Sequence, residues 1–288
     1  MPHPPVPEEA PSAEVFAALS DPARVSILEA LWAADDHTAT FSALRTTVEM
    51  DDSGRFNYHL SKLRDRFVTR TDDGYRLRLA GIHVVGALLS GAYTRTESIE
   101  PITVDEPCPR CDGPMTFEYE DERVTVSCTD CEVVSMYVGV VPGVFADYDR
   151  ETLPAVAERY TRTIIQQTNA GFCHLCEGRT NARLSFETPD TDLPDFPMVR
   201  YDCGRCGESI TADLGSAFLD HPEVVAFYHD HDIDVRESSL WRFVAVTEDR
   251  ARVLETDPLR IVVVYPAADE HLRLTLDEDL AVVAVDRG

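Results

Sequence analysis

Apolar positions recur at helical spacing in the first third of the chain, with polar breaks between the stretches. Val25, Leu28 and Leu31 form one stripe, which is typical of a helix buried on a single side. Asp21-Pro22 is a typical start for that helix, because aspartate caps helices and proline is tolerated at the first helical position. Helices are predicted over 13–19 after a capping Ser12, from Pro22 to a break at 35–37, and over 41–48.

A further helix and a β-hairpin are predicted within residues 53–80. The apolar residues of the helix, at helical spacing, are Phe56, Leu60, Leu63 and Phe67. Residues 68–79 alternate as two short strands around Asp72-Asp73-Gly74, which is a hairpin-turn signal. A helix followed by a basic hairpin is the layout of a recognition helix and a wing.

The helix predicted over 81–93 is apolar on nearly every side and contains Gly86, Ser90 and Gly91, which permit close helix approach. A helix with more apolar surface than one side can bury needs a second partner. Pairing with the same helix of another copy would supply that partner, and burial within the same chain is the alternative.

Charge sets residues 53–80 apart from the rest of the chain. The chain has 52 acids and 26 bases, a formal net charge of −26, yet this stretch has seven bases and three acids. It includes Lys62, the only lysine of the chain. Acids spread along a whole chain are typical of proteins adapted to molar salt, where counterions screen their repulsion. The local excess of bases therefore indicates an anionic partner, although charge that protects an edge strand would also explain the hairpin.

All eight cysteines fall in four C-x-x-C pairs. In a reducing compartment such pairs indicate metal ligation rather than disulfides. Each pair can place two thiolates on one side of a knuckle, and a hairpin can bring two knuckles together for tetrahedral coordination by four sulfurs. The predicted ligands are Cys108, Cys111, Cys128 and Cys131 for the first site, and Cys173, Cys176, Cys203 and Cys206 for the second.

The segments between the cysteine pairs support two zinc ribbons. Residues 115–127 alternate as two strands about 120–123. In the second ribbon, strand-like 182–186 and 199–201 are joined by the loop 187–197. We therefore expect two zinc ions per chain in structural sites, because a closed four-cysteine site leaves no position for a substrate. Redox sensing by thiolate oxidation and an iron-sulfur centre are the alternatives, and His174, inside a knuckle, is left out of the ligand set.

A helix over 150–169 is predicted between the ribbons, and its role as spacer, dimer contact or pocket wall stays open. A short helix is predicted over 221–231, where the spacing of three histidines does not favour a metal site. Apolar runs separated by turn residues then predict a small antiparallel sheet. The runs are 241–246, 251–255, 260–265, 272–276 and 281–285.

Several classes of protein are disfavoured. No run of about 18 apolar residues occurs, and the first residues lack a basic, apolar signal sequence. We therefore expect a soluble cytoplasmic protein with a short disordered lead and no membrane partner. We expect no enzyme either, because no nucleophile–base pair, phosphate loop or open metal site is found.

Two segments resemble a known family. VFAALSDPARVSILEAL and NYHLSKLRDRFV are similar to the ArsR-type winged helix-turn-helix of prokaryotic transcription regulators, over about residues 12–95. The resemblance implies a homodimer, because this family commonly pairs its terminal helices. Metal-sensing members carry a cysteine pair on the short helix before the turn, whereas FSALRTTVEM has none, so metal sensing there is not expected. Residues after the second ribbon are similar to the accessory region of uncharacterised haloarchaeal winged-helix proteins, from which no ligand follows.

The resemblance also implies a set of DNA contacts. The solvent face of the recognition helix would enter the major groove, and the wing would meet phosphate or the minor groove. The helix residues are Arg55, Asn57, Tyr58, Ser61 and Lys62, and the wing residues are Arg70, Arg76 and Arg78.

The sequence thus predicts an α+β protein: an N-terminal winged helix-turn-helix, two four-cysteine zinc ribbons, and a C-terminal helix plus antiparallel sheet. The expected function is a dimeric, sequence-specific transcription regulator of double-stranded DNA, with a small-molecule effector or protein partner left open. The alternative is a protein-interaction adaptor that uses the winged helix as a scaffold. The predicted boundaries are a lead at 1–11, the DNA-binding domain at 12–97, ribbons at 98–141 and 172–212, a connecting helix at 142–171 and an accessory module at 213–288.

Overall fold

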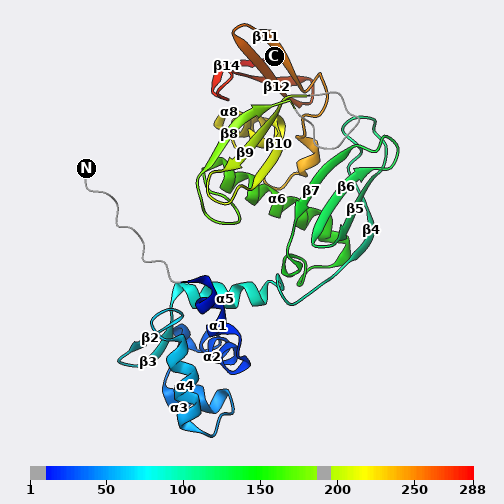
Figure 1. Ribbon diagram of the computed structural model, residues 1–288. Helices are drawn as coiled ribbons and strands as arrows, with labels where there is room; N and C mark the ends of the chain where they lie inside the picture. The colour runs from blue at the N-terminus through cyan, green and yellow to red at the C-terminus, as the bar shows by residue number, and fades with distance from the viewer. Residues whose placement is uncertain (1–10, 187–195) are drawn as a thin grey trace, which may run out of the picture. The chain divides into compact units, whose positions relative to one another are not determined.

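The computed structural model describes residues 11–186 and 196–288. The chain divides into two compact units, Met1–Arg95 and Thr96–Gly288 (Figure 1), and the division falls two residues before the boundary predicted at 97. The predicted lead at 1–11 and the predicted loop at 187–197 lie almost wholly outside the described residues. The finer boundaries inside the second unit remain predictions.

The first unit combines helices with one small antiparallel sheet in the order β1-β3-β2. Its elements are α1 (Ser12–Leu19), α2 (Pro22–Trp32), a 3-10 helix η1 (Asp35–His37), β1 (Thr38–Ala39), α3 (Phe41–Thr47), α4 (Ser53–Leu63), β2 (Val68–Thr71), β3 (Gly74–Leu77) and α5 (Leu79–Leu89). The predicted helices and hairpin are all present. Three details were wrong. Ser12 is the first helical residue rather than a cap, and the helix expected over 81–93 begins two residues earlier and ends at Leu89. Phe67, expected on the helix with Phe56 and Leu60, lies in the turn after α4, which ends at Leu63.

The core of the first unit joins α2 and α4 to the hairpin. Leu28 and Leu31 of α2 are buried together with Phe56 and Leu60 of α4, as the helical spacing predicted. The helix α5 approaches the chain just before the hairpin so closely that a Cβ on Gly81 would lie 2.5 Å from the carbonyl oxygen of Phe67. A glycine is therefore required there, and it fixes α5 against the base of the hairpin.

The second unit contains three antiparallel sheets, with strand orders β4-β5-β6-β7, β10-β9-β8 and β11-β12-β13-β14. The strands are β4 (Ile99–Val104), β5 (Met115–Glu120), β6 (Arg123–Cys128), β7 (Val134–Gly139), β8 (Thr180–Ser185), β9 (Met198–Cys203), β10 (Ser209–Asp213), β11 (Ala251–Thr256), β12 (Leu259–Ala267), β13 (Glu270–Leu276) and β14 (Val282–Arg287). The helical elements are η2 (Pro142–Val144), η3 (Arg150–Thr152), α6 (Leu153–Asn169), α7 (Leu214–Ala217), α8 (Pro222–Asp230) and η4 (Leu240–Arg242).

The helix α6 connects two hydrophobic cores of this unit (Figure 1). Val156 and Ala157, in its first half, belong to the core under β4–β7. Ile165, near its end, belongs to the core shared by β8–β10, α8 and the last sheet. This single helix therefore holds the first ribbon sheet beside the second.

The prediction of a strand over 241–246 was wrong. The segment forms the 3-10 helix η4 and then an irregular stretch. Trp241 and Val244 enter the core under β4–β7, whereas Phe243 and Ala245 enter the other core. Because the segment crosses between two cores, most of its side chains are buried although it pairs with no strand in the described structure. Its apolar residues therefore looked like those of a buried strand. The other four predicted strands of the last sheet are present as β11–β14.

Candidate metal centres and candidate nucleic-acid surface

The solvent face of α4 carries every helix residue that the sequence proposed for contact with DNA. Arg55, Asn57, Tyr58, Ser61 and Lys62 are all exposed, while Phe56, Leu60 and Leu63 on the opposite face are buried. The ammonium group of Lys62 lies 5.5 Å from the centre of the Tyr58 ring. The Ser61 hydroxyl donates to the Tyr58 carbonyl at 2.7 Å, so its proton is already used within the helix.

Asp52 fixes the first turn of α4. Its Oδ1 accepts from the backbone N–H groups of Gly54 and Arg55 at 2.8 and 3.0 Å. The N–H of Arg55, and next that of Gly54, lower the pKa of Asp52 below its usual value, because hydrogen bonds to the charged form favour it. The cap therefore sets where the exposed face of α4 begins.

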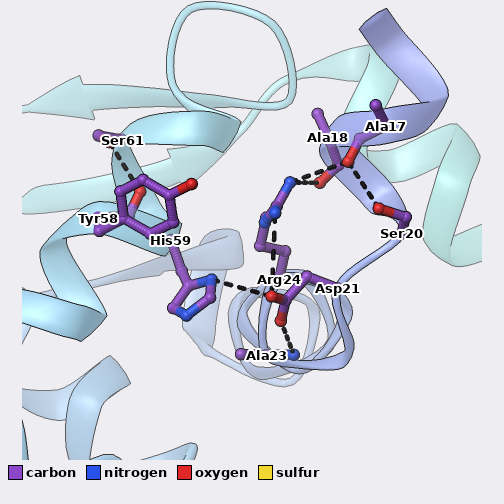
Figure 2. Close-up of polar contacts among 9 residues, drawn as sticks. All are labelled: Ala17, Ala18, Ser20, Asp21, Ala23, Arg24, Tyr58, His59 and Ser61. Carbon is purple, nitrogen blue, oxygen red and sulfur yellow. Dashed lines mark hydrogen bonds and ion pairs between the residues drawn. The ribbon is translucent and has the colours of Figure 1, made fainter. Parts of the chain in front are cut away.

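A second aspartate connects α4 to α2 (Figure 2). Asp21 caps α2 by accepting from Ala23 N at 2.9 Å, and its Oδ2 lies 3.6 Å from Nδ1 of His59. His59 is only 4% exposed and its Nδ1 has no hydrogen-bond partner, since 3.6 Å is too long for one. The histidine is therefore part of the α2–α4 contact, not of the exposed face.

Arg24 extends the same group of contacts to α1. Its Nη1 donates to the carbonyl oxygens of Ala17 and Ala18 at 3.0 and 2.9 Å, and Ser20 adds a bond to Ala17 (Figure 2). These carbonyls belong to the last turn of α1, where helices leave acceptors unpaired. The short segment 20–24 thus caps the end of α1, begins α2 and contacts α4.

The hairpin places its three predicted contact residues differently. Arg70 pairs in register with Tyr75, and Arg76 with Thr69. Since successive residues of a strand leave opposite faces, Arg70 and Arg76 lie on opposite faces of the hairpin. The guanidinium of Arg78 donates to the Asp65 carbonyl oxygen after α4, so this arginine joins helix to hairpin. All three are exposed.

The cations of this surface have no acidic partners. Within the described residues, no ion pair involves Lys62 or any arginine between 53 and 80. Arg24 and His59 are the only groups of the first unit that approach a carboxylate at this distance in the part described. Apart from Arg78, which bonds to the Asp65 carbonyl, the lysine and arginines of α4 and the hairpin are therefore available to an external anion.

The second unit brings its eight cysteines together as two quartets, as the sequence predicted. The four sulfurs of each quartet lie within 4.8 Å of one another. Within the first, Cys108–Cys131 and Cys111–Cys128 are 3.7 and 3.5 Å apart, and within the second, Cys173–Cys206 and Cys176–Cys203 are 3.8 and 3.5 Å apart. Four sulfurs about 2.3 Å from one tetrahedral ion would lie about 3.8 Å apart. Each quartet can thus hold one metal ion.

All four C-x-x-C knuckles share one backbone geometry. The N–H that follows the second cysteine bonds to the carbonyl of the first, at 3.0 to 3.2 Å. The N–H of the first cysteine bonds to the carbonyl oxygen of the second residue after the second cysteine, at 2.8 to 3.0 Å. The residue after the second cysteine has a positive φ in every knuckle. These residues are Asp112 (60°), Glu132 (59°), Glu177 (56°) and Gly207 (78°).

The knuckles also direct backbone N–H groups at sulfur. In each knuckle the N–H two residues after the first cysteine lies 3.4 Å from its Sγ. The N–H of Cys206, and next that of Arg205, lower the pKa of the Cys203 thiol to about 6. Burial raises the pKa of Cys128, but the N–H groups of Cys131 and Asp130 outweigh it and bring the value to about 7. At Cys128 and Cys203 the backbone N–H groups thus favour the thiolate, the form that binds metal.

Family models match both units. A domain of unknown function, DUF7351, matches residues 105–282, which is more than half of the chain and includes both quartets. The chain belongs to the DUF7351 family. A second domain of unknown function, DUF7347, matches residues 12–88, which contain α4 and the hairpin. No curated protein and no solved structure matches the chain.

The sequence analysis missed several residues that shape the metal centres of this DUF7351 protein and the basic surface of its N-terminal unit. The contact between Asp21 and His59 joins residues far apart in sequence, and no pattern signals it. The left-handed residue had a signal at two of the four knuckles, where Asp112 and Gly207 are of types that adopt a positive φ most readily. His174 has a sequence position inside a knuckle, yet its ring is not part of the quartet. No helix in the described part of the chain is long and apolar enough to cross a membrane.

Proposed function

We propose that this protein is a sequence-specific, dimeric transcription regulator that reads double-stranded DNA through α4 and the β2–β3 hairpin. The observation that carries the proposal is the exposed, unpaired set of bases on these two elements, in a chain of net charge −26. Such a surface attracts phosphate, and groups such as Asn57 and Arg55 on a helix can read base edges.

The order of elements supports a winged helix-turn-helix. The helices α2, α3 and α4 pack around one core, with α4 the most exposed on its outer side, and the hairpin follows directly. Thr40 caps α3 by accepting from Ala43 N at 3.2 Å, and Glu49 in the turn before α4 has a φ of 52°. A helix-turn-helix motif needs a short turn of this kind between its two helices.

The proposed dimer is supported by exposed apolar side chains on α1 and on one side of α5. Phe16 is 70% exposed, and Leu79 and Leu89 on one side of α5 are 68% and 57% exposed. A Cβ on Gly86, on that same side, would have no neighbour within 4 Å. A surface of this type marks an interaction site, and a second copy of the same face would cover it.

Zinc is the proposed metal in both quartets. Four thiolates in a closed tetrahedral arrangement favour Zn²⁺, and such sites stabilise small hairpins that cannot bury a core of their own. The metal would therefore act on the fold of the second unit. No reaction is proposed for it.

The test is a selection of bound sequences from random double-stranded DNA, with the full chain in molar KCl. The regulator requires one recurrent motif with two half-sites, and the double variant Asn57→Ala plus Lys62→Ala should lose it. The matched control, Asn181→Ala plus Arg236→Ala, replaces exposed residues of the second unit and should keep it. A double variant that selects the same motif with unchanged affinity would refute the assignment of α4.

The second candidate, a protein-interaction adaptor, predicts a different outcome of the same selection. An adaptor would enrich no motif, and any DNA binding at low salt would vanish as counterions compete for phosphate. A motif retained in molar KCl distinguishes the regulator from the adaptor.

A further inference from the structure

Two edge strands of the second unit lack the features that usually protect an exposed sheet edge. Charged side chains and proline are typical protection, since an open edge presents unpaired N–H and C=O groups to any passing strand. Among the described edge strands, β4 has Glu100 and Pro101, β2 has Arg70, and β8 has Arg183. Both β11 and β14 carry charged residues as well, and β1 has only two residues.

The strands β7 and β10 differ from all of these. β7 reads VSMYVG and has no charge or proline. β10 reads SITAD, and its one acid, Asp213, is buried, where its Oδ1 accepts from the N–H groups of Ser216 and Ala245 at 3.0 and 2.7 Å. Both strands are paired on one side only within the described structure.

These two unprotected edges line the same cavity. The cavity has a volume of about 420 Å³, and its walls include every residue of β7 and every residue of β10. Residues from both faces of each strand take part, so it is the strand edges that border the space. Among the described residues, backbone hydrogen bonds join neither β7 nor β10 to a strand across the cavity.

The floor of the cavity is apolar and belongs to the packed cores of the unit. Ile164 and Ile165 of α6 and Val244 after η4 contribute to it. Thr161 of α6 also donates to the Met136 sulfur of β7 at 3.4 Å, while Ile165 packs in the core that includes Ala212 of β10. One helix thus holds both edges, so the space between them is set before any ligand arrives.

We propose that this slot between β7 and β10 binds an extended peptide segment of a partner protein, which adds a strand by main-chain hydrogen bonds. Binding of this type takes its affinity from backbone pairing and its specificity from alternate side chains. Because β7 has six residues and β10 five, the segment needs five or six residues. Alternate residues should be small and apolar where they face the floor.

The charges around the slot restrict the segment further. Arg123 and Glu208 are on the lining, and neither forms an ion pair among the described residues. The Arg123 guanidinium is held 5.1 Å from the centre of the Tyr137 ring. An uncharged core flanked by one acid and one base complements this arrangement, since each flanking charge then meets an unpaired partner.

A peptide suits the slot better than a compact apolar molecule. Unpaired main-chain groups along both walls need a regular series of donors and acceptors, which an extended backbone provides. The Ser135 hydroxyl on the β7 wall is buried and has no hydrogen-bond partner among the described residues, so it can bond to the same backbone. An apolar ligand would leave all of these groups unsatisfied.

The experiment selects nine-residue peptides from a random displayed library against the full, metal-loaded chain in molar KCl. The enriched peptides should share an uncharged core of about five residues. Hydrogen exchange of the complex should show new protection of the amides in β7 and β10 and no change in β8 and β14. The same peptide with its alternate amides N-methylated should bind at least tenfold more weakly.

Variants provide the matched comparison. Ser135→Lys plus Thr211→Lys puts charge on the two unprotected edges and should weaken the peptide at least tenfold. Asn181→Lys plus Val283→Lys makes the same change on β8 and β14 and should leave binding unchanged. Failure to enrich any peptide, enrichment that survives in the first double variant, or unchanged binding of the N-methylated peptide would each overturn the proposal. The N-methylated peptide decides the question even where a variant fails to fold, and DNA selection is unaffected by any of these outcomes.

Discussion

At the scale of single residues, two buried carboxylates hold the second unit together. Glu158 of α6 accepts from the N–H of Leu240 at 2.7 Å and from the Ser239 hydroxyl at 3.2 Å. Burial raises the pKa of Glu158, as it does that of Asp213. Both carboxylates accept from the backbone of the irregular segment that connects the two cores. No sequence pattern identified either one, because their partners lie 82 and 32 residues away.

Glu158 makes a signed prediction for pH dependence. Its pKa in the folded state is above the unfolded value of about 4.3. At pH values between these two pKa values, the folded state therefore binds more protons than the unfolded state. The stability of the wild type should therefore fall as the pH rises through that interval and stay lower above it. Glu158→Gln should remove this fall, as measured by the melting temperature of the metal-loaded protein from about pH 4 to pH 8. An identical pH profile in wild type and variant would contradict it.

The same site predicts a difference between two substitutions. Glu158→Gln keeps an acceptor for Leu240 N, whereas Glu158→Leu leaves that buried N–H unpaired at a cost of about 2 kcal/mol. Denaturant unfolding should place the Leu variant clearly below the Gln variant. Equal stability of the two would mean that water, not Glu158, satisfies the segment.

At the scale of elements, apolar spacing predicted most of the fold. α2, α4, the two hairpins β2–β3 and β5–β6, and α6 all follow from it, because each has a single buried face. The spacing failed at 241–246, where one short segment feeds two cores in turn. It also could not show which strands end at a sheet edge, since strand order depends on contacts between residues far apart in sequence. The slot between β7 and β10 is therefore visible only in three dimensions.

Equivalent positions of two knuckles predict opposite effects on stability when a glycine is introduced and when one is removed. Glu177 has a φ of 56°, a conformation that costs a non-glycine residue about 1 kcal/mol. Glu177→Gly should therefore leave the metal-loaded protein as stable or more stable, whereas Gly207→Val, at a φ of 78°, should destabilise it. Melting temperatures with measured metal content decide this. A more stable Gly207→Val would show that the knuckles do not require the left-handed residue.

At the scale of the whole molecule, the two cysteine quartets predict two metal ions per chain with separate ligands. Elemental analysis should give two zinc ions, and Cys108→Ser plus Cys111→Ser should give one. Because zinc in such sites contributes on the order of 10 kcal/mol to folding, a chelator should unfold the second unit and leave the circular dichroism of α1–α5 in place. Iron in place of zinc, or loss of both ions in the variant, would contradict the paired, independent sites.

The proposed dimer makes the last prediction. Gly86→Glu plus Leu89→Glu places two charges on the apolar side of α5. Neither position contributes to the core of its own unit. The variant should sediment as a monomer and lose roughly two orders of magnitude of affinity for a two-half-site DNA, since the second half-site then binds without linkage. Gly91 is unsuitable for this test, because its φ of 73° and the Arg95 side chain at 2.9 Å make any replacement strained. Ala80→Glu, exposed on another side of α5, is the control and should stay dimeric. A Gly86/Leu89 variant that remains dimeric with full DNA affinity would move the interface to another surface.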